Sequence, residues 1–314
     1  MRDSGRRSCL NIYIGVTDKN WYEQLKREIA DEVNFWNPGA SSFKALKENE
    51  LFLFKLHYPY NMIVGGGFFV RYTQLPPFLA WDAFGRKNGT TSYAELIKRI
   101  EKYRGRNNIS ETSQIGCTVL TAPFWFEESD WLPVPDWSPH IVKGKLYSTE
   151  TEAGKRLFRE IQDRIPRSIR APEVIEAETD ERRYAESVVK HRLGQGAFRV
   201  AVTDAYQRRC AITGEKTLPV LEAAHIMPYS ENGPHQVTNG LLLKSDFHTL
   251  FDDGYITLTN DYRVEVSRRL HDDYGNGRDY YKYHGQQILI LPELELQRPD
   301  SQFIEWHNNN VYLG

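Results

Sequence analysis

The chain has 314 residues, of which 40% are apolar, 13% aromatic and 26% charged, and its formal net charge is −2. This composition excludes a disordered or fibrous protein, and the near-zero charge argues against a protein that simply coats a polyanion. The length exceeds the roughly 100 to 200 residues of a typical single domain, so two domains are expected.

The three cysteines, Cys9, Cys117 and Cys210, are too few and too far apart for a disulfide framework or a four-cysteine zinc site. This usage indicates a reducing compartment. Residues 1–9 lack the apolar core of a signal peptide, and no apolar run approaches the roughly 18 residues of a membrane helix. We therefore expect a cytoplasmic protein with no membrane partner.

The first half is predicted to be a compact, barrel-like α+β unit. Helical spacing runs over residues 21–31 and 92–103, and short segments rich in strand-forming residues lie at 11–16, 50–56, 62–70, 115–120 and 140–148. The run of Gly65, Gly66 and Gly67 interrupts one of these strands. Such a run favours a bulge or a close backbone approach over a phosphate-binding loop.

The domain boundary is expected where the sequence becomes polar and charged. Over residues 149–179 a helical segment is broken by Pro166 and Pro172. We therefore predict a first domain at 1–148, a linker at 149–180 and a second domain at 181–314. Helical spacing resumes over residues 181–209.

The next stretch has the order strand, loop, strand, helix. The strands are expected at 218–226 and 240–243, the polar loop at 228–238 and the helix at 245–251. Ser245 is a suitable N-cap, and Gly254 is suited to end the helix. Residues after 255 are expected to form a strand hairpin, a tyrosine-rich turn region and a terminal segment, and we assign them no function.

Three polar residues, His225, Asn239 and His248, stand one on each element of this frame. Hydrolysis of a phosphodiester needs a base that activates water and a divalent ion that stabilises the charge on the phosphate and the leaving oxygen. A neutral imidazole can be the base, and a histidine with a carboxylate can hold the ion. The residue types therefore fit a nuclease.

This block resembles the HNH nuclease family, in which a histidine ends the first strand, an asparagine opens the second and a histidine lies on the helix. The surrounding AAHIMPYS, NGLLL and HTLFDDG are similar to bacterial restriction-type members. The resemblance implies that His225 is the general base, that Asn239 braces the loop and that His248 binds the metal. It also implies a ββα-metal fold for the second domain.

The sequence departs from many HNH sites at Ala224, where an acidic or histidine ligand often precedes the base. Because one histidine alone holds a metal weakly, a carboxylate should complete the site. Glu222 lies two residues before Ala224 and therefore on the same face of the strand, and Asp252 lies one helical turn after His248. We favour Asp252 over Glu222, with Asp246 as the third choice. The ion is expected to be Mg²⁺ or Mn²⁺.

Two neighbouring residues are given structural interpretations. Cys210 has no partner for a zinc pair and is expected to be a small core residue. His235, in a Gly-Pro-His loop, is expected to be a loop residue or a phosphate contact rather than a catalytic group.

A nuclease site made of a general base and a metal ion contacts the phosphate backbone of DNA and not the edges of the nucleobases. Sequence or modification specificity should therefore come from the first half. That half is rich in aromatic residues, which suit a pocket for an extruded base. Trp36, followed by Asn37, and Trp81, followed by Asp82, combine a stacking face with a polar neighbour, and both are expected to lie in loops. We therefore predict that Trp36, Trp81 and Asp82 form a modified-base pocket, although a tryptophan in a small barrel is often part of the core.

The first half also resembles the EVE domains of the PUA-like superfamily, which are small β-barrels. The resemblance is carried by NIYIGVTDKNW, NFWNPG, GGGFF and AWDAFGRKNG. It implies a modification-dependent restriction endonuclease that flips and reads 5-methylcytosine or 5-hydroxymethylcytosine in double-stranded DNA. Two alternatives stay open: a nuclease whose first domain recognises an unmodified sequence, RNA or a protein, and a degenerate scaffold that only binds nucleic acid. Cutting both strands needs two sites, so a homodimer is expected.

Overall fold

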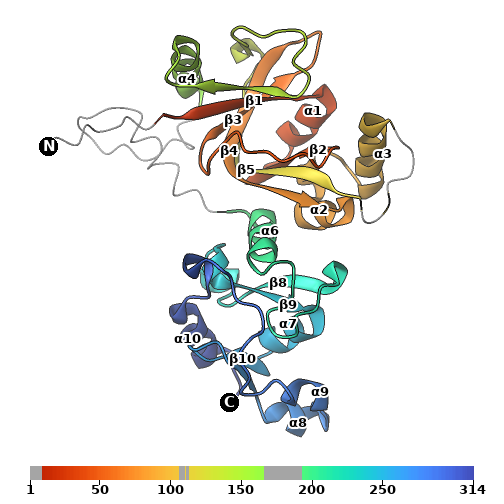
Figure 1. Cartoon of the computed structure of the whole chain (residues 1–314), viewed down its shortest axis with the longest axis vertical. Helices are drawn as coiled ribbons and strands as arrows, with labels where there is room; N and C mark the ends of the chain where they lie inside the picture. The colour runs from red at the N-terminus through yellow and green to blue at the C-terminus, as the bar shows by residue number, and fades with distance from the viewer. Residues whose placement is uncertain (1–8, 106–109, 111–112, 166–192) are drawn as a thin grey trace, which may run out of the picture. The chain divides into compact units, whose positions relative to one another are not determined.

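The computed structural model describes residues 9–105, 110, 113–165 and 193–314 (Figure 1). The chain divides into two compact units, residues 1–191 and 192–314. Each unit combines strands with helices, so the predicted α+β class is confirmed. Within the described residues, no helix is long and apolar enough to cross a membrane.

A seven-stranded mixed sheet forms the centre of the first unit. Its hydrogen-bonded order is β2-β5-β4-β3-β1-β7, and β6 pairs with β4. The β1 and β3 strands are parallel, and the other pairs are antiparallel. The strands are β1 (Asn11–Thr17), β2 (Glu32–Asn37), β3 (Leu51–Leu56), β4 (Met62–Leu75), β5 (Ile115–Trp125), β6 (Leu132–Pro133) and β7 (Gly144–Ser148).

Both faces of this sheet are covered, and β3 shows why. All six residues of its sequence LFLFKL are buried. Because side chains alternate across a strand, Phe52 and Phe54 enter one hydrophobic core while Leu51 and Leu53 enter another. Burying each such side chain contributes about 1.5–3 kcal/mol. A continuous apolar run therefore marks a strand sandwiched between two layers.

Helices supply the two outer layers. The α1 helix (Lys19–Arg27) contributes Trp21, Tyr22 and Leu25 to the core that contains Phe52, and α4 (Glu152–Arg164) packs into the core that contains Leu51. Two further helices, α2 (Pro77–Phe84) and α3 (Tyr93–Arg104), follow β4 in the chain and are joined by a short 3₁₀ helix, η1 (Gly85–Asn88). The sequence had not indicated β2 or α2.

The glycine run lies inside β4, as the sequence indicated. The pairing of β4 with β5 shifts register between Gly66 and Phe68, which marks a bulge. A Cβ on Gly65 would lie 2.2 Å from the backbone oxygen of Phe124. The run therefore permits a close approach of two strands, and the prediction is confirmed.

The helical part of the expected linker packs as part of the first unit. Leu157, Phe158, Ile161 and Ile165 are buried against the sheet, because α4 is amphipathic and turns its apolar face inward. Thr151 caps this helix by accepting a hydrogen bond from the Gly154 amide. Residues 166–180, with both expected helix-breaking prolines, lie outside the described residues, and the boundaries at 148 and 180 stay predictions.

The second unit has the predicted order of strand, loop, strand and helix. The β8 strand (Leu221–His225) pairs antiparallel with β9 (Gly240–Lys244), and α7 (Ser245–Asp252) follows at once. Single-turn 3₁₀ helices, η3 (Leu218–Val220), η4 (Tyr229–Glu231) and η5 (Val237–Asn239), flank these strands. The other elements are α6 (Gln195–Ala205), β10 (Ile256–Leu258), β11 (Val264–Val266), α8 (Arg269–Tyr274), α9 (Arg278–Tyr281), η6 (Glu295–Gln297) and α10 (Ser301–Asn310).

The ends of α7 correct one prediction and confirm another. Ser245 is not the N-cap: Lys244 holds that position in an extended conformation, and no side chain caps the helix. The reason is that β9 runs directly into α7, so Ser245 is already helical. At the other end Gly254 has φ +80, as expected of a residue that terminates a helix. Cys210 is fully buried in the core, also as expected.

Candidate active site

The β8–β9 pair and α7 bring the predicted residues of the second unit into one frame (Figure 1). His225, the last residue of β8, lies opposite Gly240, so Asn239 stands beside the end of β8. The amide of Ile226 donates a hydrogen bond to the backbone oxygen of Asn239 at 3.0 Å. His248 on α7 contacts Glu222 of β8. The hairpin and the helix are thus connected through these side chains.

His225 is held as a neutral imidazole. Its ring stacks on Phe198 of α6, with ring centroids 4.0 Å apart, and its Nε2 lies 2.9 Å from Nδ1 of His235. Burial, together with the nearby His235 and His248, lowers the pKa of His225 to about 4. At neutral pH the ring is therefore unprotonated and able to accept a proton, as a general base must.

Asn239 ties together both ends of the loop that follows β8. Its side chain is fully buried and makes three hydrogen bonds. The Nδ2 group donates to the backbone oxygens of Met227 at 2.9 Å and Pro234 at 3.0 Å, and Oδ1 accepts from the Met227 amide at 2.9 Å. A buried amide with this many partners fixes its surroundings, because leaving any partner unsatisfied costs about 1–3 kcal/mol.

His248 lies between two carboxylates, one at each ring nitrogen. Its Nδ1 is 2.6 Å from Oε2 of Glu222, and its Nε2 is 3.3 Å from Oδ2 of Asp252. Burial raises the pKa of Asp252, whereas His248 lowers it and Asp253 and Glu222 raise it further. The first and second choices for the metal carboxylate, Asp252 and Glu222, therefore both contact His248.

His248 and Asp252 could supply two ligands to a divalent ion, which is fewer than a site built from protein ligands alone would need. Within the described residues, no group of three or more histidine, cysteine, aspartate or glutamate side chains converges on one point. Histidines that bind metals usually donate their other ring N–H to a carboxylate, as Nδ1 of His248 can to Glu222. His248 Nε2 and Asp252 would then be protein ligands. Mg²⁺ commonly uses one or two carboxylates and completes its shell with water and phosphate oxygens.

Asp246, the third carboxylate considered, faces other partners. Its Oδ2 lies 2.9 Å from Nζ of Lys244 and accepts a hydrogen bond from the Tyr280 hydroxyl at 3.4 Å. These contacts join the start of α7 to α9. We therefore do not place Asp246 among the metal ligands.

Two side chains that contact His225 were not singled out as functional in the sequence. His235, ten residues after His225, was expected to serve the loop or a phosphate, and the structure places it in contact with His225. Phe198 precedes the motif on α6 and stacks on the same ring. The histidine in the Gly-Pro-His loop was the available signal for the first, and nothing in the sequence indicated the second.

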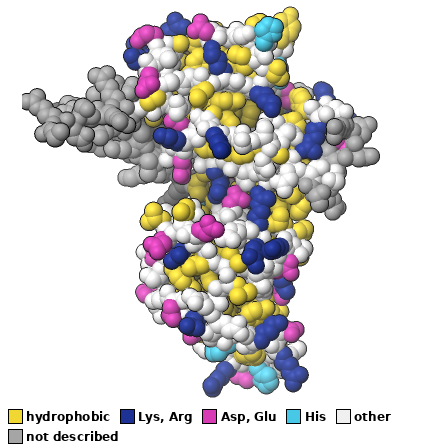
Figure 2. Space-filling model, viewed as in Figure 1, with side chains coloured by type: hydrophobic (Ala, Val, Ile, Leu, Met, Phe, Trp, Pro, Cys, Tyr) yellow, Lys and Arg dark blue, Asp and Glu magenta, His cyan; other side chains and the backbone are white. Residues whose placement is uncertain are grey.

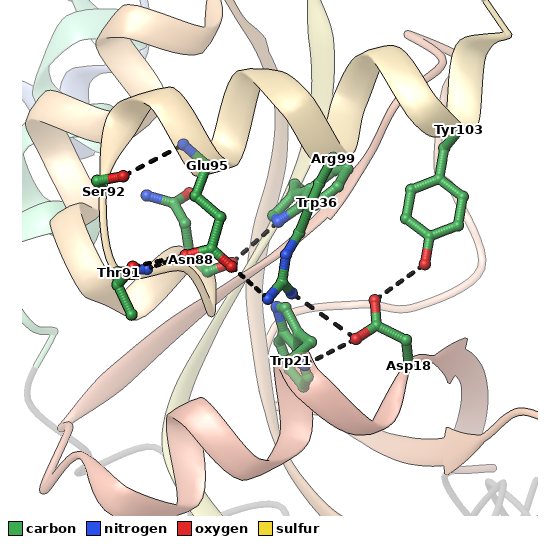
Figure 3. A network of polar contacts seen from close by, with 9 residues as sticks. All are labelled: Asp18, Trp21, Trp36, Asn88, Thr91, Ser92, Glu95, Arg99 and Tyr103. Atoms are coloured by element: carbon green, nitrogen blue, oxygen red, sulfur yellow. Dashed lines mark hydrogen bonds and ion pairs between the residues drawn. The ribbon is translucent and has the colours of Figure 1, made fainter.

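In the first unit, Trp36 lies on β2 rather than in a loop, and a polar network surrounds it (Figure 3). Its indole N–H donates to the backbone oxygen of Asn88 at 2.9 Å, and its ring centroid is 6.2 Å from that of Tyr103. The Tyr103 hydroxyl donates to Asp18 at 3.0 Å. Burial, with the Asp18 charge, raises the pKa of Tyr103 to about 12. The orientation of the partly exposed Trp36 ring is therefore fixed.

The same network joins the start of α1 to α3. Arg99 pairs with Glu95 at 2.6 Å and with Asp18 at 3.7 Å. Glu95 also accepts hydrogen bonds from the amide and hydroxyl of Thr91, at 2.8 and 2.6 Å. Figure 3 shows Arg99 reaching from α3 toward Asp18. The sequence did not indicate these residues, which come from separate segments.

Trp81 and Asp82 lie on α2, not in the loop that the sequence suggested. Trp81 is partly buried and Asp82 is exposed. Within the described part of the chain, no ring contact joins Trp81 to Trp36. Membership of a common pocket with Trp36 therefore stays a prediction.

A hollow of about 690 Å³ lies beside α4, and its lining is mixed in charge. Four carboxylates and two arginines line it, which does not suit a DNA backbone. On the face shown in Figure 2, basic and acidic side chains are interspersed. The residues lining the hollow are Asp136, Glu152, Ala153, Arg156, Arg159, Glu160 and Asp163.

Comparison with known proteins identifies the second unit's frame. Residues 210–259 match the HNH endonuclease family model, a range that includes β8, the following loop, β9 and α7. No curated protein matches the chain. The match agrees with the positions of His225, Asn239 and His248 along these elements.

Two solved structures are similar to the chain at low identity. ASCH from Zymomonas mobilis has 9% identity and a TM-score of 0.32, with 47% of this chain and 94% of that chain covered. The modification dependent TagI restriction endonuclease has 13% identity and a TM-score of 0.28, with 91% of this chain and 77% of that chain covered.

Proposed function

We propose that this chain, whose residues 210–259 form an HNH endonuclease domain, is a metal-dependent endonuclease that reads cytosine-modified double-stranded DNA. One observation carries the nuclease part: a neutral histidine and a histidine–carboxylate pair lie on one ββα frame. These are the groups that metal-assisted hydrolysis of a phosphodiester requires.

In the proposed reaction His225 is the general base. Within the described residues, Nε2 of His225 is hydrogen-bonded to Nδ1 of His235, and Nδ1 of His225 makes no hydrogen bond. Nδ1 of His225 is therefore available to accept a proton from water. The water oxygen forms the new bond to phosphorus as the bond from phosphorus to the 3′ oxygen breaks. Asn239 keeps the loop after His225 in place.

His248 Nε2 and Asp252 would hold the divalent ion, and Glu222 would orient the His248 ring. When bound, Mg²⁺ or Mn²⁺ supplies positive charge to the phosphate and to the leaving 3′ oxygen. Either ion suits a site of one imidazole and carboxylate oxygens.

We also propose that the first unit selects 5-methylcytosine or 5-hydroxymethylcytosine by flipping the base. Trp36 is partly exposed and its ring is held by Asn88, which suits stacking against an extruded base. Trp81 and Asp82 are proposed to lie at the same pocket. This part rests on side-chain chemistry and on the sequence resemblance to EVE domains.

The decisive experiment compares one plasmid in unmodified, 5-methylcytosine and 5-hydroxymethylcytosine forms, with Mg²⁺ or Mn²⁺. The wild-type protein should cut the modified forms at enzyme concentrations that leave the unmodified form uncut, and cut the unmodified form only at high enzyme concentration. His225→Ala should lower the rate by about 10²- to 10⁴-fold, the usual contribution of a general base. Equal cutting of all forms would support the nuclease activity and contradict the recognition of modified bases. Cutting that survives His225→Ala would overturn the mechanism.

Cleavage of both strands requires two such sites, so we propose that the active form is a homodimer. Sedimentation during cleavage conditions should show a dimer, and the rate of double-strand breaks should rise more steeply than linearly with enzyme concentration below the dissociation constant. A monomer that makes double-strand breaks in one binding event would contradict this proposal.

A further inference from the structure

The base His225 has an imidazole partner that its nuclease role does not by itself require. Nε2 of His225 and Nδ1 of His235 lie 2.9 Å apart, which is a hydrogen-bond distance. We propose that His235 is a positioning residue, which accepts the Nε2–H of His225 and so directs Nδ1 of His225 toward the attacking water. This inference rests on the proposed function.

Aromatic contacts hold both imidazoles. His225 stacks on Phe198 with an interplanar angle of 14°, and His235 stacks on Tyr229 with centroids 4.6 Å apart and an angle of 7°. A ring held on one face keeps its plane while it exchanges protons. The pair is therefore fixed in orientation by two different elements, α6 and the 3₁₀ turn η4.

The backbone that carries His235 is fixed as well. Asn239 donates to the backbone oxygen of Pro234, the residue before His235. The Gly233 amide donates to the oxygen of Pro228, and a Cβ on Gly233 would lie only 1.8 Å from the Met227 oxygen. The compact loop thus admits no side chain at Gly233. Through Pro234, Asn239 also sets the position of His235.

The proposed proton arrangement is balanced. Before reaction, His225 carries its proton on Nε2 and donates it to Nδ1 of His235, which carries its own proton on Nε2. Water then gives one proton to Nδ1 of His225, and its oxygen attacks phosphorus. The resulting imidazolium donates more strongly to His235, because a charged donor makes a stronger hydrogen bond than a neutral one. His235 therefore stabilises the state in which the base has taken the proton.

The test uses two substitutions of His235 that remove its ring but differ in hydrogen bonding. His235→Asn places an amide oxygen near the position of Nδ1, whereas His235→Leu offers no acceptor. Both lose the stacking on Tyr229, so damage to the loop affects both. His271→Asn on α8 is the matched control, because His271 is exposed and lies outside this loop. Cleavage of a labelled modified duplex is measured at saturating and at limiting DNA.

We expect His235→Leu to lower kcat by about 10- to 100-fold with little change in KM, because the variant loses one hydrogen bond to a charged group. His235→Asn should recover most of that loss, and His271→Asn should match the wild type. A rise in KM at unchanged kcat would overturn the proposal and make His235 a phosphate contact. Equal losses in the Leu and Asn variants would overturn it in favour of a loop-packing role.

His225→Ala is measured in the same series. If this variant is inactive while both His235 variants cleave like the wild type, the positioning role fails and the nuclease mechanism stands. If His225→Ala cleaves like the wild type, the mechanism itself fails. The two failures are therefore distinguishable.

Discussion

The two units place their candidate functional residues in different ways. In the second unit, His225, Asn239 and His248 lie on consecutive elements of one hairpin and one helix. In the first unit, the side chains around Trp36 come from the start of α1, from β2 and from α3. A site built from consecutive elements can be recognised from spacing, whereas a site built from distant segments depends on how a whole sheet and its helices pack.

This difference implies two separable functions. Changes in the second unit should slow the cleavage of every DNA, and changes near Trp36 should alter only the preference between DNAs. Variants of Asp252 and Trp36 test that separation, and the pH dependence of cleavage tests the environment of His225.

The largest effect is expected from Asp252→Asn. Removing this carboxylate ligand should weaken Mn²⁺ binding, measured by calorimetry, by at least about 100-fold. Glu222→Gln removes the partner that orients His248 and should weaken Mn²⁺ binding by about 10- to 100-fold. Both variants should slow cleavage of modified and unmodified DNA alike. Asp253→Asn, which changes the exposed neighbouring carboxylate, is the control. If Asp252→Asn binds Mn²⁺ normally and Glu222→Gln does not, then Glu222 is the metal ligand and Asp252 is the residue that orients His248.

An intermediate effect is expected from Trp36→Ala. Stacking of a base on an aromatic ring contributes about 1–3 kcal/mol, so the preference for modified DNA should fall by roughly 5- to 150-fold. Cleavage of unmodified DNA at high enzyme concentration should not change. Ile29→Ala, at an exposed apolar side chain of the same unit, is the control. An equal slowing of both substrates would remove the separation between the units.

The smallest effect concerns pH. A base acts only when unprotonated, and the pKa of His225 is lowered to about 4, so its protonation should cost nothing at neutral pH. The cleavage rate should therefore stay nearly constant between about pH 8 and about pH 5, and fall as the pH approaches the lowered pKa. Mn²⁺ binding is measured over the same range, so that metal loss is separated from base protonation. A midpoint near the ordinary histidine value would contradict the buried, neutral base.

The success of the sequence predictions follows the same division. The strands, helix and terminating glycine around His225 were predicted because each depends on a few neighbouring residues. Ser245 was misplaced as an N-cap because its role depends on β9 entering α7 without a turn. The position of Trp36 on a strand was missed because β2 is recognised only by its pairing with β5. The position of Trp81 on a helix was missed because α2 is short and begins without a side-chain N-cap.

The candidate metal-binding carboxylates show what residue spacing alone can predict. Glu222 was placed by the alternation of a strand and Asp252 by the turn of a helix, and both contact His248. Proposing Asp252 rather than Glu222 as the ligand depends on which ring nitrogen of His248 each carboxylate faces. The contact between His225 and His235 depends on a loop that Asn239 holds in place, and no local sequence pattern predicts the shape of that loop.

The buried amide of Asn239 has a consequence for the chemical ageing of the protein. An asparagine followed by glycine deamidates readily in a flexible chain, because an unhindered backbone nitrogen can attack the side-chain carbonyl. Gly240 cannot be enlarged to prevent this, since a Cβ there would lie 2.4 Å from Val202. In the folded protein the Asn239 amide is buried and bonded, and the Gly240 N–H is engaged by Val237. Folding thus protects this residue from conversion to an aspartate, which would face the Met227 and Pro234 oxygens with a negative charge.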